Sequence, residues 1–495
     1  MESKDIVPEI IEDHPIIENR ELSLFEALIP IVALVVMLGY NVYVFGDEAT
    51  GGSNQFILLI GAAIAAIVGF RNKVSYASMM EEVARNVKST TGAILILLLV
   101  GSLSGTWLIS GVIPTMVYYG LQILNPSVFL PACLVICAVI SVATGSSWTT
   151  SATVGIAMIG IGGAIGIPLG MVAGAVVSGA YFGDKISPLS DTTNLAPAMA
   201  GTDLFTHIRY MMYTTVPTFL LAFVLFIILG LMQETKDLGN DTATLDAIRA
   251  SFNVSPWLFL VPALVIFLIV KKTEPLIALL TGALVAGLFA LIFQPGIVAT
   301  IGGSDKLDFV SGYKGILNAL TVETHVETSN PMLNELFSAK GMQGMLSTIW
   351  LILCAMTFGG IMESIGALAR ITKALMSAFQ SIFGLFASTV ASCLAINLTA
   401  SDQYLAIVVP GKMFANAYRD KGLAPENLSR TLEDAGTVTS ALIPWNTCGA
   451  YQSGVLGVPV FAYAPYAFFN FLSPFMTLLF AAFSIKIRQL KSVSS

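Results

Sequence analysis

Charged residues are scarce in this chain, and their scarcity excludes most classes of soluble protein. Only 11% of the 495 residues are Asp, Glu, Lys or Arg, whereas 55% are hydrophobic. A soluble globular chain carries roughly 25% charged residues. The formal net charge of −7 argues against a nucleic-acid partner, which would require a basic surface. The composition therefore indicates an integral membrane protein.

Histidines, cysteines and catalytic motifs are also few. The three histidines, at 14, 207 and 325, fall in or near polar connections, so none is expected to relay protons. The five cysteines lie in or beside apolar segments without CxxC spacing, and we interpret them as reduced packing residues. No HExxH or GxSxG motif occurs, which argues against an enzyme, and we expect no cofactor. The acidic N-terminus lacks the basic region of a secretory signal.

Long apolar runs are abundant, and they form two series separated by a polar stretch. Several runs are shorter than the ~20 residues that cross a bilayer, and Gly or Pro interrupts some, as in re-entrant hairpins and broken helices. The candidate spans are 25–46, 55–70, 92–120, 127–143, 149–165, 167–183 and 209–232, then 256–270, 275–294, 341–366, 380–398, 404–418, 436–458 and 460–486. The predicted parts are a polar tail (1–24), a first repeat (25–232), a connecting loop (233–255), a second repeat (256–486) and a C-terminal tail (487–495).

One segment between spans is amphipathic, and a weaker counterpart lies at 308–320. In 76–88 the apolar residues recur at helical spacing opposite charged residues that include Glu82 and Arg85, which predicts a helix lying on the membrane. Basic residues gather in the loop 71–90, so this loop and the N-terminus are predicted to be cytoplasmic. With that orientation, the two series of spans would run antiparallel.

The two series resemble each other at an almost constant offset of 255 to 256 residues. The Ser/Thr-rich segment 144–150, here called the first tip, matches 399–403, the second tip. The Pro-containing segment 184–194, the first break, matches 440–448, the second break, with Asn446 placed opposite Asp191. Inverted repeats let a transporter alternate between two access states, and substrate sites form where interrupted helices meet. The four segments are therefore the predicted ion site.

The side chains of these segments favour a hard cation. Pro188 disrupts the helix and frees backbone carbonyls, and Pro444 does the same in the second break. Gly145 permits a tight turn in the first tip. Oxygen atoms are the ligands that hard cations prefer. The candidate Na⁺ ligands are Asp191, Asp402, Thr192, Ser187, Ser190, Thr144, Ser146, Ser147, Thr399, Ser401, Asn446 and Thr447.

Carboxylates inside the apolar segments are candidate proton carriers. An intramembrane carboxylate is costly, and by default it suggests a functional site. The candidates are Asp191, Asp402, Asp184 and Glu363. For Glu363 an ion pair with Arg370 is an equal alternative, and Asp184 with Lys185 could form structural ion pairs with other helices. Glu433 and Asp434, before the second break, are interpreted as a solvated loop.

The stretch Gly183-Asp184-Lys185-Ile186-Ser187-Pro188-Leu189-Ser190-Asp191-Thr192-Thr193 strongly resembles the signature of NhaC-type Na⁺/H⁺ antiporters. The likeness extends over about residues 25–486. It implies Na⁺/H⁺ exchange across the bacterial inner membrane and membership of the ion transporter superfamily. Folds of that superfamily are all-α, with two inverted repeats that each hold a re-entrant hairpin and a broken helix, and they are usually homodimers. The tips would map to 144–148 and 399–403, and the breaks to 187–193 and 443–447.

The favoured prediction is thus an alternating-access antiporter in which Asp191 and Asp402 bind Na⁺ or H⁺ in turn. Some members of the same family resemble malate/lactate or other organic-ion exchangers, so a Na⁺-coupled carboxylate exchanger is the alternative. No Arg lies in either tip or break, which disfavours a dianion, whereas Lys185 keeps that alternative open.

Overall fold

The computed structural model describes residues 22–45, 51–123, 126–233, 242–328, 333–334, 337–378 and 381–490. Its described elements are almost all helical. Most of the predicted tail 1–24, His14, part of the loop 233–255 and the end of the tail 487–495 lie outside the described residues.

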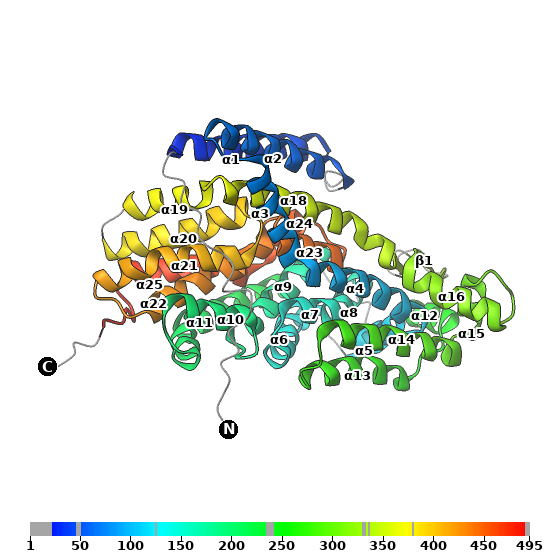
Figure 1. Cartoon of the computed structure of the whole chain (residues 1–495). Helices are drawn as coiled ribbons and strands as arrows, with labels where there is room; N and C mark the ends of the chain where they lie inside the picture. The colour runs from blue at the N-terminus through cyan, green and yellow to red at the C-terminus, as the bar shows by residue number, and fades with distance from the viewer. Residues whose placement is uncertain are drawn as a thin grey trace, which may run out of the picture.

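The first series of helices matches the predicted spans in order. Figure 1 shows α1 and α2 side by side along one edge of the molecule, with α9 and α23 in its middle. The elements are α1 (Leu24–Phe45), α2 (Ser53–Arg71), α3 (Tyr76–Ser89), α4 (Thr91–Ile109), α5 (Val112–Ile123), α6 (Pro126–Thr144), α7 (Ser147–Thr150), the π-helix η2 (Ser151–Gly155), α8 (Ile156–Ala164), α9 (Leu169–Ile186), α10 (Asp191–Ala200) and α11 (Leu204–Met232).

The second series is more irregular and contains one small strand pair. Its elements are α12 (Thr242–Ser251), η4 (Pro256–Phe259), α13 (Leu260–Val270), α14 (Pro275–Phe293), α15 (Pro295–Ile301), α16 (Phe309–Thr321), β1 (Thr324–His325), β2 (Ser338–Ala339), η5 (Met342–Met345), α18 (Leu346–Ser364), α19 (Ala367–Ala378), α20 (Ile382–Thr399), α21 (Gln403–Asp420), α22 (Glu426–Leu432), the π-helix η6 (Glu433–Thr437), the 3-10 helix η7 (Val438–Leu442), α23 (Thr447–Leu456), α24 (Val460–Tyr463), η8 (Ala464–Tyr466) and α25 (Phe468–Ala482). The strands β1 and β2 pair antiparallel.

Many of the helices are long and apolar enough to cross a membrane. Eight described helices meet that requirement, or up to ten if each bent pair counts as one span. The bent pairs are Thr244–Ser251 with Pro256–Val270, at 83°, and Val460–Tyr466 with Phe468–Ala482, at 53°. The prediction of an all-α polytopic membrane protein is therefore confirmed, including its interrupted helices.

Three local predictions need correction. The single span predicted at 92–120 is two helices, because Gly111 adopts a positive φ of 83° and turns the chain between α4 and α5. The polar stretch 233–255 contains the helix α12. The amphipathic helix forms as predicted, as α3, but Glu82 is buried rather than on its exposed face. The backbone of α3 packs closely against α18. A Cβ at Gly360 of α18 would lie only 2.7 Å from the Val83 Cα.

Candidate functional site

Each tip is a helix end, a left-handed residue and a capped helix start. At the first tip, α6 ends at Thr144, Gly145 has a φ of 70°, and Ser146 caps α7 by accepting the Thr149 N–H at 3.2 Å. A Cβ on Gly145 would lie 2.6 Å from the Leu189 Cβ of the first break. Only glycine therefore suits this position, for both its backbone conformation and the space available.

The second tip repeats this geometry without a glycine. After α20 ends, Ser401 has a φ of 61°, an uncommon conformation for a residue with a side chain. Asp402 then caps α21, because its Oδ1 accepts the N–H groups of Tyr404 at 2.8 Å and Leu405 at 3.0 Å. The cap residues Ser146 and Asp402 are 256 positions apart, so the offset between the tips is 256 and not the predicted 255.

The breaks also end one helix and cap the next. Pro188 lies between the end of α9 and the cap residue Ser190, whose hydroxyl accepts the Thr193 N–H at 3.4 Å. Pro444 lies between η7 and the cap residue Asn446, whose Oδ1 accepts the Cys448 N–H at 3.0 Å. The structural counterpart of Asn446 is therefore Ser190, and not Asp191 as the sequence match suggested.

Within each half, the tip contacts the break. In the first half, the Ser147 N–H donates to Asp184 Oδ2 at 3.0 Å, and the Ser187 hydroxyl donates to the Val142 carbonyl at 2.8 Å. In the second half, the Thr447 N–H donates to the Ser401 carbonyl at 2.9 Å. These bonds join the two segments of each half.

Two aromatic residues join the halves. The Tyr404 hydroxyl of α21 donates to the carboxylate of Asp191 at the start of α10. Tyr451 of α23 stacks on Trp148 of the first tip, with ring centroids 4.0 Å apart, and its hydroxyl donates to the Trp148 carbonyl at 3.0 Å. The four predicted segments therefore come together, although they are far apart in the sequence.

The carboxylates at this junction differ in exposure. Asp184 and Asp402 are each only 6% exposed, whereas Asp191 is exposed. Asp191 lies within electrostatic range of both buried carboxylates. The hydroxyls of Ser147 and Ser190 lie beside Asp184. Asp184 is therefore as central to the junction as the two carboxylates favoured from the sequence.

Two oxygen atoms at the junction are buried and unpaired. Asp184 Oδ1 and Ser401 Oγ accept or donate no hydrogen bond among the residues that the structure describes. A buried polar atom without a partner is costly, and it calls for an explanation such as a ligand. Both atoms belong to segments singled out from the sequence.

Other candidate ligands are engaged by neighbouring groups. The Thr399 hydroxyl donates to the Ala395 carbonyl at 2.7 Å, and the hydroxyls of Ser190 and Thr192 lie 3.1 Å apart. The hydroxyl of Thr144 lies 3.4 Å from that of Thr150. The carbonyls freed near Pro188 are partly satisfied as well, since Thr193 Oγ1 donates to the Lys185 carbonyl at 2.9 Å. A cation would have to share these oxygens with existing hydrogen bonds.

Glu363 of α18 faces α3 and does not pair with Arg370. Arg370 Nε instead donates to the Leu22 carbonyl at 3.0 Å. Glu363 is buried, lies within electrostatic range of Asp402 and Glu82, and its Oε2 lacks a hydrogen-bond partner in the described part of the chain. Glu82 pairs with Arg85 at 2.9 Å; burial raises the pKa of the Glu82 carboxyl, and the Arg85 charge opposes this rise.

The interpretation of Glu433 and Asp434 as a solvated loop is wrong. Both side chains are fully buried in the π-helix η6. Asp434 forms an ion pair with the fully buried Lys185 of α9, and it accepts the Thr214 hydroxyl of α11 at 2.8 Å and the Thr477 hydroxyl of α25. Lys185 therefore makes the structural pair considered from the sequence, with a partner that the sequence did not reveal.

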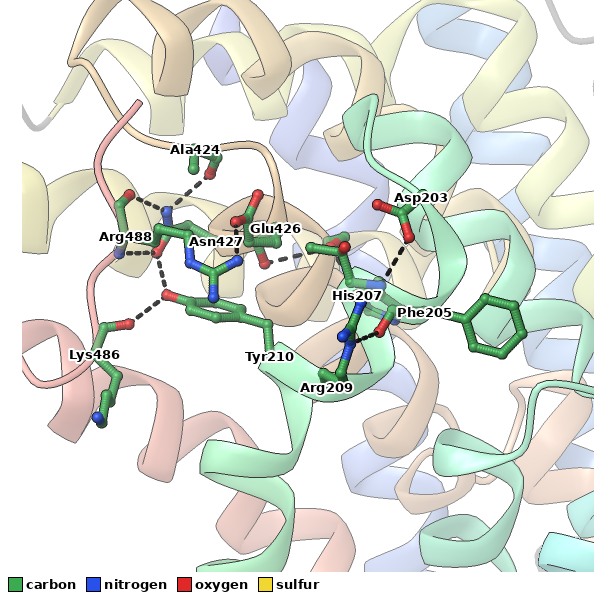
Figure 2. Close-up of polar contacts among 12 residues, drawn as sticks. Asp203, Phe205, His207, Arg209, Tyr210, Ala424, Glu426, Asn427, Lys486 and Arg488 are labelled. Carbon is green, nitrogen blue, oxygen red and sulfur yellow. Dashed lines mark hydrogen bonds and ion pairs between the residues drawn. The ribbon is translucent and has the colours of Figure 1, made fainter. Parts of the chain in front are cut away.

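His207 lies at the start of α11, near a polar connection as predicted, but its side chain does not face solvent. It is fully buried in α11, with Nδ1 2.8 Å from the Ser429 hydroxyl. Figure 2 shows it in a polar cluster in which the Tyr210 side chain points toward Asn427 and the Lys486 carbonyl. This cluster attaches the segment after α25 to α22. The alternation of polar and apolar residues at the start of α11 did not indicate that this part of the helix would be buried.

Comparison with known proteins identifies the family of the chain. The model of the Na⁺/H⁺ antiporter family matches residues 179–485, a region that begins in α9 and includes the second tip and both breaks. The chain belongs to this family of Na⁺/H⁺ antiporters. It is thus a member of a transporter family and a multi-pass membrane protein.

Three relatives of this family member align over most of their length. The Na⁺/H⁺ antiporter NhaC of Alkalihalophilus pseudofirmus is 39% identical over 88% of this chain and 92% of the relative. The NhaC antiporter of Bacillus subtilis is 37% identical over 81% of this chain and 86% of the relative. The malate-2H⁺/Na⁺-lactate antiporter of Bacillus subtilis is 34% identical over 92% and 94%. The resemblance to NhaC-type proteins drawn from the sequence is therefore confirmed.

Proposed function

We propose that this protein exchanges Na⁺ for H⁺ by alternating access across the bacterial inner membrane. The observation that supports it most is the contact between halves, where Tyr404 of one half binds Asp191 of the other beside the buried carboxylates Asp184 and Asp402. Two relatives named NhaC support the same activity. The proposal includes a transporter without enzymatic activity, a cytoplasmic N-terminus and a homodimer.

Competition for the same carboxylates provides the coupling. Asp191 and Asp402 bind Na⁺ when ionised, and a proton on either carboxyl removes the negative charge that attracts the cation. The neutral oxygens of the tips and breaks complete the Na⁺ shell, and Asp184 and Glu363 are the further proton carriers. Because a bound proton and a bound Na⁺ exclude each other, Na⁺ and protons cross the membrane in opposite directions.

A Na⁺-coupled carboxylate exchanger is the second candidate, and the relative named as a malate/lactate antiporter favours it. This candidate function requires Lys185 to bind the carboxylate of the substrate. Its ammonium is fully buried and already bound to Asp434, which weakens this candidate. Uptake of labelled malate or lactate by proteoliposomes discriminates between the two activities.

The replacement Asp191→Asn tests the proposed Na⁺ ligand. We expect Na⁺-dependent proton movement in everted vesicles to fall roughly tenfold, because losing about 1.4 kcal/mol of ion binding weakens affinity by that factor. The measurement is fluorescence dequenching on addition of Na⁺. Asp420→Asn changes another exposed aspartate, at the far end of α21; it is the matched control and should leave the signal unchanged. Full activity of the Asp191 variant would remove this residue from the site.

A further inference from the structure

Glu433 is a fully buried carboxylate that the transport site described above does not use. It begins the π-helix η6, between α22 and η7. Neither of its carboxyl oxygens has a hydrogen-bond partner among the described residues. Short π-helical turns are rare, and they occur frequently at functional sites.

The neighbours of Glu433 do not compensate a negative charge on it. The charged groups that face it are Lys185 and Asp184 of α9 and Asp434 of its own helix. Lys185 is already bound to Asp434. Three carboxyl groups therefore share one ammonium group in the protein interior. Removing a charge from water without a partner costs several kcal/mol, so the cluster cannot hold every carboxylate ionised without a bound cation or proton.

Other packed elements supply no counter-charge. The helices α20 and α25, which pack against η6, contain no Asp, Glu, Lys, Arg or His. The helices α21 and α10 also pack against η6, and their charged side chains are exposed: Lys412, Arg419 and Asp420 on α21, and Asp191 on α10. Arg430 lies one turn earlier, but its guanidinium packs over the rings of Tyr210, Phe386 and Phe480, with the Tyr210 centroid at 4.7 Å. On the side of Glu433, the hydroxyl of Thr437 is buried, faces the carboxyl and has no hydrogen-bond partner in the described part of the chain.

We propose that Glu433 is an additional proton-binding residue of the transport cycle, beyond the proton carriers proposed above. This inference rests on the proposed Na⁺/H⁺ exchange. The carboxyl O–H bond breaks when the cluster faces water on one side, the proton passes to that water, and the carboxylate takes a proton from water when the cluster faces the other side. No other bond changes.

A proton suits this position better than Na⁺ does. The Lys185 ammonium already provides a positive charge next to the carboxylates, and it would repel a second cation. The Thr437 hydroxyl is a neutral side-chain oxygen that faces Glu433, whereas hard cations bind to several oxygens. A proton neutralises the carboxyl and needs no such shell.

The consequence is that each cycle moves one proton more than the tips and breaks alone would carry. The charge transferred in each cycle therefore changes by one unit, and so does the response of exchange to the membrane potential. The test is the reversal potential of Na⁺ flux in proteoliposomes that contain the full-length protein, with the pH gradient and the membrane potential set independently. It yields the number of protons moved for each Na⁺.

We expect Glu433→Gln to keep Na⁺/H⁺ exchange driven by a pH gradient but to move one proton fewer for each Na⁺. Glu426→Gln is the matched control: Glu426 lies about two helical turns before the start of η6, is bound to Arg488 at 2.6 Å, and should leave the proton count unchanged. If the Gln variant does not fold, Glu433→Met, which replaces the carboxyl by an apolar group of similar volume, carries the same expectation.

An unchanged proton count in either folded variant overturns the role of Glu433 and leaves the exchange activity intact. The absence of any Na⁺/H⁺ exchange by the wild-type protein would instead contradict the proposed function. The two failures are thus distinguishable in one set of vesicles.

Discussion

Replacing Asp402 by asparagine is expected to abolish most of the Na⁺-driven proton movement while leaving the fold intact. Asparagine caps helices as well as aspartate does, so it can still accept the N–H groups of Tyr404 and Leu405. What the variant loses is a buried negative charge beside Asp191. A charged ligand contributes about 1.5–3 kcal/mol through its hydrogen bonds alone, which corresponds to a loss of roughly tenfold to a hundredfold.

Asp203→Asn is the matched control for this prediction. Asp203 is also an N-cap aspartate, and its carboxylate accepts the Thr206 N–H at 2.9 Å at the start of α11. It is exposed and lies outside the junction, so the same chemical change should leave transport unaltered. Both variants are compared at equal protein amounts in everted vesicles. If Asp402→Asn kept the activity of the control, Asp402 would be only a helix cap.

The replacement Lys185→Met should have the largest effect on stability. It leaves Asp434 buried and without its ammonium partner, and removing one member of a buried ion pair costs about 3–5 kcal/mol. The hydroxyls of Thr214 and Thr477 still donate to the carboxylate, but they carry no charge. Thermal unfolding of the detergent-solubilised protein measures the loss.

A second substitution separates the buried charge from the packing. The double variant Lys185→Met with Asp434→Leu should recover most of the lost stability, because apolar residues of similar volume replace a buried pair at little cost. Arg488→Gln is the comparison at a half-exposed pair, the bond between Arg488 and Glu426, and it should cost less than about 1 kcal/mol. If Lys185→Met and Arg488→Gln lost the same stability, the buried pair would contribute no more to stability than the half-exposed one.

The sequence predicted the membrane class and most helix positions, because apolar length and Gly or Pro interruptions are local properties. It also located the tips and breaks, since each is a short polar segment between apolar runs. The sequence alignment of the two halves was wrong by one residue at the second break, where it placed Asn446 opposite Asp191. The cap geometry places Ser190 opposite Asn446, and identical residue types are too few to fix such a register.

The sequence could not predict the environment of the η6 region. Residues 426–440 are rich in polar side chains, and a polar segment is ordinarily a solvated one. In this protein the polar groups of α22 and η6 face Lys185, His207 and the hydroxyls of α11 and α25. Hydropathy measures composition and carries no information about partners more than two hundred residues away. The orientation of the repeats relative to each other remains a prediction.

The most direct test of the central claim is proton release on Na⁺ binding by the purified protein. Na⁺ is added to the detergent-solubilised protein in weak buffer, and the pH change is recorded at several starting pH values. If Na⁺ and H⁺ compete for the carboxylates at the tips and breaks, Na⁺ should release protons, its apparent affinity should fall as the pH is lowered, and Asp402→Asn should release fewer. Na⁺ binding with no proton release and with the same affinity at every pH would contradict the account.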